Sequence, residues 1–262
     1  MLQKLNKYRA IFSLTFNQGL KNYKLLFGLS LFLITCLIIF AHLWKVAAIN
    51  THSEFSPETL LWYIAFNEWV LISVPEIQRD MQEDLQSGKL AYLLPRPISY
   101  IGATFAEGFA QLVLQLVVLG FVTFLFAFLW TQSFPLTFLQ FVIMLLLGLF
   151  AGIVGLIFQM LIGLSSFWLH DVTPVNWVWE KFLFIFGGLI LPLSAYPFWL
   201  QKIAAFTPYS AILGGRSGLI FGFDQNQIFS LFCMLAVWLL IGSIALKMTY
   251  RRGLKILNIS GG

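Results

Sequence analysis

Charged residues are scarce in this sequence. Only 10% of its 262 residues are Asp, Glu, Lys or Arg, whereas 59% are hydrophobic. Water-soluble domains contain about 25% charged and about 45–50% apolar residues, so a soluble globular domain is excluded. A disordered chain and a coiled coil are excluded as well, because both need a far more polar sequence. The mean hydropathy of +0.85 instead predicts an integral membrane protein.

Cysteine and histidine are also rare. The two cysteines, Cys36 and Cys233, lie inside long apolar runs, where a thiol acts as a small hydrophobic side chain. The three histidines, His42, His52 and His170, are spread along the chain and form no cluster with metal-ligand spacing. The sequence therefore predicts no disulfide, no metal site and no cofactor bound by this chain.

Continuous apolar runs fill most of the chain. A helix needs about 20 apolar residues to cross about 30 Å of hydrocarbon, and the runs lack the alternation typical of strands. We predict an all-α, polytopic membrane protein with a single transmembrane domain over residues 1–262. Its six predicted transmembrane helices are Leu25–Trp44, Pro57–Val74, Ser99–Leu129, Pro135–Leu169, Trp177–Tyr196 and Ile228–Met248.

The lysines and arginines are distributed unevenly between the loops. With the N-terminus inside, the inner segments contain Lys4, Lys7, Arg9, Lys21, Lys24, Arg79, Lys89, Arg96, Lys181, Lys247, Arg251, Arg252 and Lys255. Only Lys45, Lys202 and Arg216 fall outside. By the positive-inside rule both termini are cytoplasmic. The net charge of +5 follows from this bias, so it indicates no nucleic-acid partner.

Residues 1–24 precede the first span and show helical periodicity. Apolar side chains recur every three or four residues, at Leu5, Tyr8, Phe12, Phe16 and Leu20. The cations fall elsewhere on the helix, which is typical of an amphipathic helix that lies in the lipid interface. A basic flank with chance periodicity is the alternative.

Residues 75–98, between the second and third spans, contain a short amphipathic helix. Ile77, Met81 and Leu85 share an arc of roughly 80°, and Gly88 ends the helix. The charged residues of this segment are Glu76, Arg79, Asp80, Glu83, Asp84 and Lys89. Because so short a helix is marginal in water, its apolar stripe must be covered. Anionic lipid repels an acidic helix, so the pattern favours a protein partner over the membrane interface.

Polar side chains also lie within two of the spans. Asn67 and Glu68 lie midway along the second span, and Glu107 and Gln111 lie near the start of the third. Ionisable groups at membrane depth are expensive and usually face a cavity or a partner. Two interpretations remain open for these residues, a translocation path or gate and a buried hydrogen bond within one subunit.

The segment 197–227 is apolar but repeatedly interrupted. The breaks that begin at the end of the fifth span are Pro192, Tyr196, Pro197, Pro208, Gly214 and Gly215. The segment is too interrupted to cross a membrane and too apolar for a solvated loop. We predict a hairpin of short helices that re-enters the outer leaflet. It is followed by the last span and a basic cytoplasmic tail at residues 228–262.

The order of these parts resembles the membrane subunit of bacterial type-2 ATP-binding-cassette (ABC) transporters. The resemblance covers nearly the whole chain and is supported by residues 87–97 (SGKLAYLLPRP), 191–197 (LPLSAYP) and 203–208 (IAAFTP). It implies a permease in the bacterial inner membrane, paired with a second copy or a related permease. Glu76–Gly88 would be the coupling helix moved by a separate ATPase subunit, and the N-terminal helix would be the connecting helix beside it.

The chain has no ATP-binding motif of its own. The motif G-x-x-x-x-G-K-[ST] does not occur, and residues 214–217 (GGRS) lack both the lysine and the spacing. ATP and Mg would therefore be bound by the partner, and the chain is not expected to be an enzyme by itself. The resemblance implies an exporter, and the many aromatic residues suit an amphipathic cargo such as a lipid, glycolipid, peptide or drug.

The alternative function is a self-contained secondary transporter or channel. That class would require an inverted repeat and helices broken at mid-membrane, and no repeat is found. An intramembrane enzyme is disfavoured, because the sequence offers no Ser/Lys dyad and no His/Asp/Glu cluster at helical spacing.

Overall fold

The computed structural model describes residues 2–50, 56–93 and 98–260. These residues form helices and loops without any strand. Five of the helical segments are long and apolar enough to cross a membrane, at Tyr23–Val46, Pro57–Gln86, Tyr100–Thr131, Phe138–Phe167 and Gln225–Ile256. The predicted class, an all-helical protein with several transmembrane helices, is confirmed.

The α-helices follow one another with short connections. They are α1 (Leu2–Lys21), α2 (Tyr23–Asn50), α3 (Pro57–Ser73), α4 (Ile77–Gln86), α5 (Lys89–Leu93), α6 (Tyr100–Thr131), α7 (Phe138–Leu164), α8 (Thr173–Phe186), α9 (Phe198–Ala205), α10 (Pro208–Ile212), α11 (Gly214–Ser217) and α12 (Gln225–Ser260). Three 3₁₀ turns complete the chain, η1 (Ser165–Phe167), η2 (Leu193–Ala195) and η3 (Gly218–Ile220).

The predicted fifth span, Trp177–Tyr196, differs most from the structure. Helix α8 begins earlier, at Thr173, and has only 14 residues. At 1.5 Å per residue it is about 21 Å long, which is short of the hydrocarbon thickness. The helix ends because Gly187 and Gly188 follow it, and Gly188 adopts a φ of +65°. A continuous helix to Tyr196 is therefore wrong.

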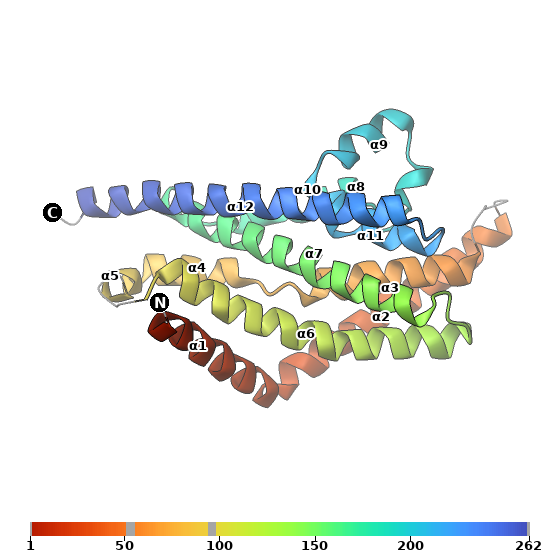
Figure 1. Ribbon diagram of the computed structural model, residues 1–262, viewed down its shortest axis with the longest axis horizontal. Helices are drawn as coiled ribbons and strands as arrows, with labels where there is room; N and C mark the ends of the chain where they lie inside the picture. The colour runs from red at the N-terminus through yellow and green to blue at the C-terminus, as the bar shows by residue number, and fades with distance from the viewer. Residues whose placement is uncertain (1, 51–55, 94–97, 261–262) are drawn as a thin grey trace.

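The long helices lie roughly along one axis of the molecule (Figure 1). Helix α1 begins and helix α12 ends at the same end of the bundle, which we call the terminal end; α4 and α5 also lie there. Helices α7 and α12 run parallel, because Phe150 packs on Phe232 and a Cβ on Gly242 would meet Ile157. The start of α12 therefore lies beside the start of α7, at the opposite end.

Helix α3 is the centre of the core. Most of its side chains are buried, and the indole of Trp69 donates a hydrogen bond to the carbonyl of Leu116 on α6 (2.8 Å). On the other side, α7 approaches through Gly148, where a Cβ would overlap the Trp69 ring. Small residues on α7 thus allow close helix packing within the subunit.

Helix α1 packs along the first half of α6. The Phe12 and Phe109 rings are 5.7 Å apart, and a Cβ on Gly19 would lie 2.5 Å from the Leu114 side chain. The Tyr8 hydroxyl accepts a hydrogen bond from the backbone amide of Ser99 (3.2 Å). Apolar side chains of the N-terminal segment therefore pack against protein, on helix α6.

Candidate functional site

The apolar stripe of α4 is buried within the chain. Ile77 and Met81 are only 2% and 1% exposed. A Cβ on Gly163 of α7 would lie 2.8 Å from the Met81 sulfur, and one on Gly108 of α6 would lie 3.0 Å from Ile77. Leu85 is half-buried and packs against the same group of buried side chains as Ile77 and Met81.

The expectation that a partner protein covers this stripe is therefore wrong. Helix α6 has 32 residues and α7 has 27, so they are about 48 and 40 Å long. Both exceed the hydrocarbon thickness of about 30 Å and extend alongside α4. The sequence argument treated α4 as an isolated helix, although the predicted spans Ser99–Leu129 and Pro135–Leu169 were already longer than the hydrocarbon thickness requires.

The exposed face of α4 is charged. Glu76, Arg79, Asp80 and Glu83 are all exposed, and their spacing of three, four and seven residues puts them on one side of the helix. Arg79 Nε pairs with Glu76 Oε2 at 3.0 Å, while Asp80 and Glu83 have no ion-pair partner among the described residues. This face, which we call the acidic face, has a net charge of about −2.

The end of α4 is fixed by Gly88 and by a salt bridge. Gly88 adopts a φ of +70°, as a helix-terminating glycine does. Lys89 Nζ lies 2.6 Å from Asp84 Oδ1, and the Tyr100 hydroxyl of α6 lies 3.4 Å from Asp84 Oδ2. The hydrogen bond with Asp84 raises the pKa of Lys89 above its usual value. Asp84 thus links α4, α5 and α6.

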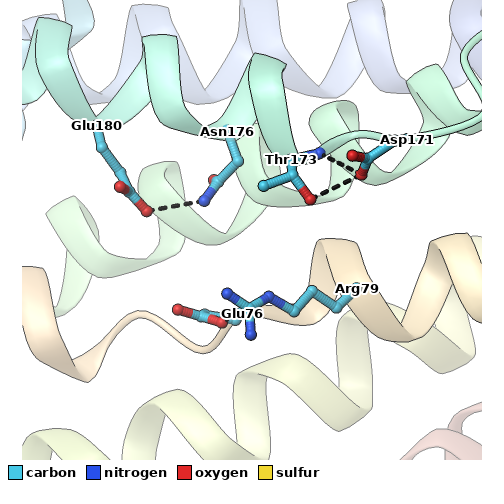
Figure 2. Close-up of polar contacts among 6 residues, drawn as sticks. All are labelled: Glu76, Arg79, Asp171, Thr173, Asn176 and Glu180. Carbon is cyan, nitrogen blue, oxygen red and sulfur yellow. Dashed lines mark hydrogen bonds and ion pairs between the residues drawn. The ribbon is translucent and has the colours of Figure 1, made fainter.

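Polar contacts also join α4 to the loop before α8. Gln82 Oε1 accepts a hydrogen bond from the amide of Val172 (2.9 Å), and Gln86 donates to the carbonyl of His170. In Figure 2, the side chains of Glu76 and Arg79 lie between the start of α4 and the helix that carries Asn176 and Glu180. On α8, the amide of Asn176 donates to Glu180 (2.8 Å).

The start of α8 is held by Asp171. Its carboxylate accepts hydrogen bonds from the amide of Thr173 (2.9 Å) and from the Thr173 hydroxyl (2.7 Å), as Figure 2 shows. These two donors lower the pKa of Asp171.

The contacts of α4 described above join the acidic face to three separate parts of the fold, α6, α7 and the loop before α8.

The broken end of α8 is stabilised by polar side chains from α3. A helix that ends away from water leaves carbonyl groups without donors unless the protein itself supplies them. The hydroxyl of Tyr63 donates to the carbonyl of Gly188, and the amide of Asn67 lies 3.4 Å from the carbonyls of Gly188 and Leu189. Tyr63 and Asn67 are one turn apart, on one face of α3.

The hairpin approaches the same point from the other side. Gly214 donates a backbone hydrogen bond to Gly187 (2.7 Å), and Ser217 donates to Asn67 Oδ1 (2.6 Å). Arg216 is 0% exposed and donates through Nη2 to the carbonyl of Phe66 (2.7 Å). We call this network the buried junction; it consists of Tyr63, Asn67, Gly187, Gly188, Gly214, Arg216 and Ser217.

The sequence analysis counted Arg216 among the cations of the outer segments and did not predict that it is buried. Its Nη1 has no hydrogen-bond partner in the described part of the chain, and its guanidinium carbon lies 6.0 Å from the Trp69 ring centre. Neighbouring glycines and Ser217 were the available signal, because small residues permit close backbone packing. The four-residue spacing of Tyr63 and Asn67 was a second signal.

The four candidate path residues have four different surroundings. Asn67 belongs to the buried junction. Glu68 is 5% exposed and lies near Cys36 on α2. It has no hydrogen-bond partner in the described residues. Glu107 is exposed near Asp84 and Lys89, and Gln111 lines a cavity beside α1. The structure therefore does not bring the four residues together.

The hairpin residues have distinct structural roles. Pro192 and Pro197 precede η2 and α9, and Pro208 begins α10. A Cβ on Gly215 would lie 2.8 Å from the Ser210 carbonyl, so this glycine also permits a close approach. Tyr196 is half-exposed beyond η2.

No protein-family model matches the chain, and no curated protein matches it either. Within residues 2–50, 56–93 and 98–260, no three His, Cys, Asp or Glu side chains are grouped closely enough to hold a metal ion. The fold and these contacts define a class, a helical multi-pass membrane protein with a helix discontinuity that is packed on protein.

Proposed function

We propose that the chain is the permease subunit of an ABC exporter in the bacterial inner membrane. A second copy or a related permease completes the translocation path for an amphipathic cargo, and a separate ATPase subunit binds ATP and Mg. The observation that carries this proposal is the arrangement of α4. Its acidic face is free at the terminal end, whereas its apolar stripe is anchored on α6 and α7.

Such an arrangement suits a helix that transmits movement. Met81 contacts Gly163 with little free space, and packed interiors transmit displacement rather than absorb it. A partner that moves the acidic face therefore moves α7, and it also moves α3, which is joined to α4 by only three residues, Val74–Glu76. Because α3 supplies Tyr63 and Asn67, the displacement reaches the buried junction and the hairpin.

The acidic face also indicates how the partner is recognised. Asp80 and Glu83 are unpaired carboxylates beside the Glu76–Arg79 pair. A groove that carries lysine or arginine side chains complements them, and such charge complementarity speeds association and selects the partner. In this proposal the apolar stripe holds α4 in its own subunit, and charge attracts the ATPase.

A six-span topology with both termini in the cytoplasm is part of the proposal. Support comes from the parallel course of α7 and α12: residues 165–224 must return from the end of α7 to the start of α12, the length of one crossing. Helix α8 covers part of this distance and the broken segment after Gly187 covers the rest. The terminal end is cytoplasmic in this proposal because most lysines and arginines belong to segments at that end.

A secondary transporter or channel is the second candidate. The observation that favours it is the buried junction, where a helix breaks against mid-span residues of α3 and where Arg216 Nη1 has no partner among the residues that the structure describes. Broken helices and buried charges are typical of secondary transporters. Dependence of transport on a separate ATPase distinguishes the two candidates.

The test is affinity purification of the tagged chain from its host in mild detergent, followed by mass spectrometry and an ATP-hydrolysis assay. We expect the wild-type chain to retain a Walker-motif ATPase. The double variant Asp80→Lys, Glu83→Lys should lose it, and Asp224→Lys, which reverses an exposed charge beside the start of α12, should retain it. Absence of any ATPase from the wild-type complex, or cargo transport without ATP, would contradict the proposal.

A further inference from the structure

A cavity lies at the corner between α1 and α2. The helix is interrupted at Asn22, whose amide bonds back to the carbonyls of Gln18 and Gly19. The chain changes direction there, and the inside of the corner faces α6. A cavity of about 220 Å³ remains between the three helices. Water occupies about 30 Å³ per molecule in the liquid, so the cavity holds a group of several heavy atoms.

The cavity is lined by uncharged polar side chains. Thr15, Gln18 and Asn22 come from the corner, and Gln111 and Gln115 come from α6. Amide and hydroxyl groups both donate and accept hydrogen bonds. None of these five side chains bonds to another residue in the described part of the chain. The lining therefore suits a group that also donates and accepts, which is the property of a hydroxyl-bearing ligand.

Gln115 provides a second, independent observation. It is only 8% exposed, and its Oε1 is buried without a hydrogen-bond partner in the residues described. Buried polar groups in proteins are nearly always bonded, so the side-chain amide of Gln115, a residue that lines the cavity, lacks a partner that a ligand can supply. The cavity opens beside the exposed residues Gln18 and Asn22, so a ligand can enter at the corner.

The chemical groups around the corner follow one another in the same order of polarity as the parts of a phospholipid. Lys21 and Lys24 flank Asn22 and are exposed, and neither forms an ion pair in the described residues. Beyond them, the outward side chains of α2 are apolar, with Phe27 among the most exposed. Hydroxyl-binding groups, cations and an apolar surface follow one another. A headgroup, a phosphate and acyl chains follow one another in the same order.

We infer that the α1–α2 corner binds an anionic phospholipid with a hydroxyl-bearing headgroup, of the phosphatidylglycerol type. The hydroxyl groups enter the cavity and form hydrogen bonds with the amide and hydroxyl side chains that line it, Gln115 among them. The phosphate lies near Lys21 and Lys24, and the acyl chains follow α2. Because α1 packs on α6 and continues into α2, the bound lipid fixes the angle at which the N-terminal helix meets the bundle. The inference is independent of the proposed transport function.

The test uses purified, delipidated protein and native mass spectrometry with three dioleoyl lipids. Phosphatidylglycerol is compared with phosphatidylmethanol, which has the same charge and no hydroxyl, and with phosphatidylcholine. We expect phosphatidylglycerol to bind about fivefold more tightly than phosphatidylmethanol, the effect of about one hydrogen bond. Equal binding of these two lipids would overturn the inference. So would equally strong competition by soluble glycerophosphoglycerol, because the ligand would then not be a lipid.

Variants separate the headgroup site from general lipid contact. Gln115→Leu should abolish the preference for phosphatidylglycerol, while Gln159→Leu should keep it. Gln159 is the matched control because it is also a buried glutamine with an unpartnered Oε1, on α7 and outside this cavity. If Gln115→Leu does not fold, Thr15→Val removes a hydroxyl from the opposite wall and should reduce the same preference. A preference unchanged in the folded cavity variant would refute the assignment.

The two lysines give a further readout. The double variant Lys21→Gln, Lys24→Gln should weaken binding of both anionic lipids by a similar factor. The preference for the hydroxyl-bearing headgroup should remain, because the cavity is unchanged. Loss of the preference with retained affinity for anionic lipid would contradict the proposed order of headgroup and phosphate.

Discussion

Replacing Gly214 with alanine tests whether the buried junction holds the hairpin on the bundle. The added Cβ would lie 2.6 Å from the carbonyl oxygen of Gly187 and 2.6 Å from the hydroxyl oxygen of Tyr63. Both distances are well below van der Waals contact, and one of the two atoms belongs to the backbone. The methyl group therefore fits only if α11 moves away from the broken end of α8.

The magnitude follows from what that movement breaks. Overpacking in a closed core costs about 1–3 kcal/mol, and a buried backbone group that loses its hydrogen bond costs about 1–3 kcal/mol. The bond at risk joins the Gly214 amide to the Gly187 carbonyl at 2.7 Å. Because moving α11 away relieves the overlap but weakens this hydrogen bond, the two costs do not add in full, and we expect a total of about 3 kcal/mol. For a chain of this size that corresponds to about 6–12 °C in the midpoint of thermal unfolding.

The measurement is thermal unfolding of the purified protein in detergent, and Gly218→Ala is the matched control. Gly218 lies one turn further along the same hairpin, and a Cβ there meets nothing within 4 Å. We expect its midpoint to stay within about 2 °C of the wild-type value. Equal midpoints for the two variants would refute the reasoning, because they would show that the junction is not tightly packed.

Three further predictions concern α4, the core and the topology. Met81→Asp should prevent the chain from folding, whereas Met81→Leu should lower the free energy of unfolding by less than about 1.5 kcal/mol. Membrane insertion and thermal unfolding measure the two effects, and a folded Met81→Asp chain would contradict the burial of Met81. Glu68→Gln should leave thermal stability unchanged or raise it, because an unpaired buried carboxylate is removed. Impaired cargo transport in that stable variant would identify a functional charge. A large loss of stability would contradict the absence of a partner for Glu68. In a cysteine-free background, a cysteine at Gln225 should react with an impermeant thiol reagent from outside intact cells and a cysteine at Gln86 should not; labelling at position 86 would reverse the proposed orientation.

The sequence by itself determined the class of the protein and the position of most helices. A run of about 20 apolar residues has one stable form in a bilayer, a helix, whatever its neighbours are. The stops were also local, because Gly88 can adopt a positive φ at little cost and ends α4 as the sequence predicts. Gly187 and Gly188 end α8 in the same local way, although the predicted fifth span continued past them to Tyr196.

The tertiary structure decided which surfaces are free and which polar residues meet. The sequence pattern left the stripe of Ile77 and Met81 available for a partner, but the structure shows that α6 and α7 cover it. Arg216 looked like an outer-loop cation, yet it is buried against Phe66, 150 positions away in the sequence. The candidate path residues lie close together in the sequence within each pair, Asn67 with Glu68 and Glu107 with Gln111, but their side chains have different surroundings in the structure.

The physical reason is the range of the interactions. Helix formation and termination depend on residues within about one or two turns, so a local pattern predicts them. Burial and hydrogen bonding at the buried junction depend on how α3, α8 and α11 approach one another. That approach is set by close contacts such as Gly214 on Gly187, between segments far apart in the chain, which no periodicity of a single segment encodes.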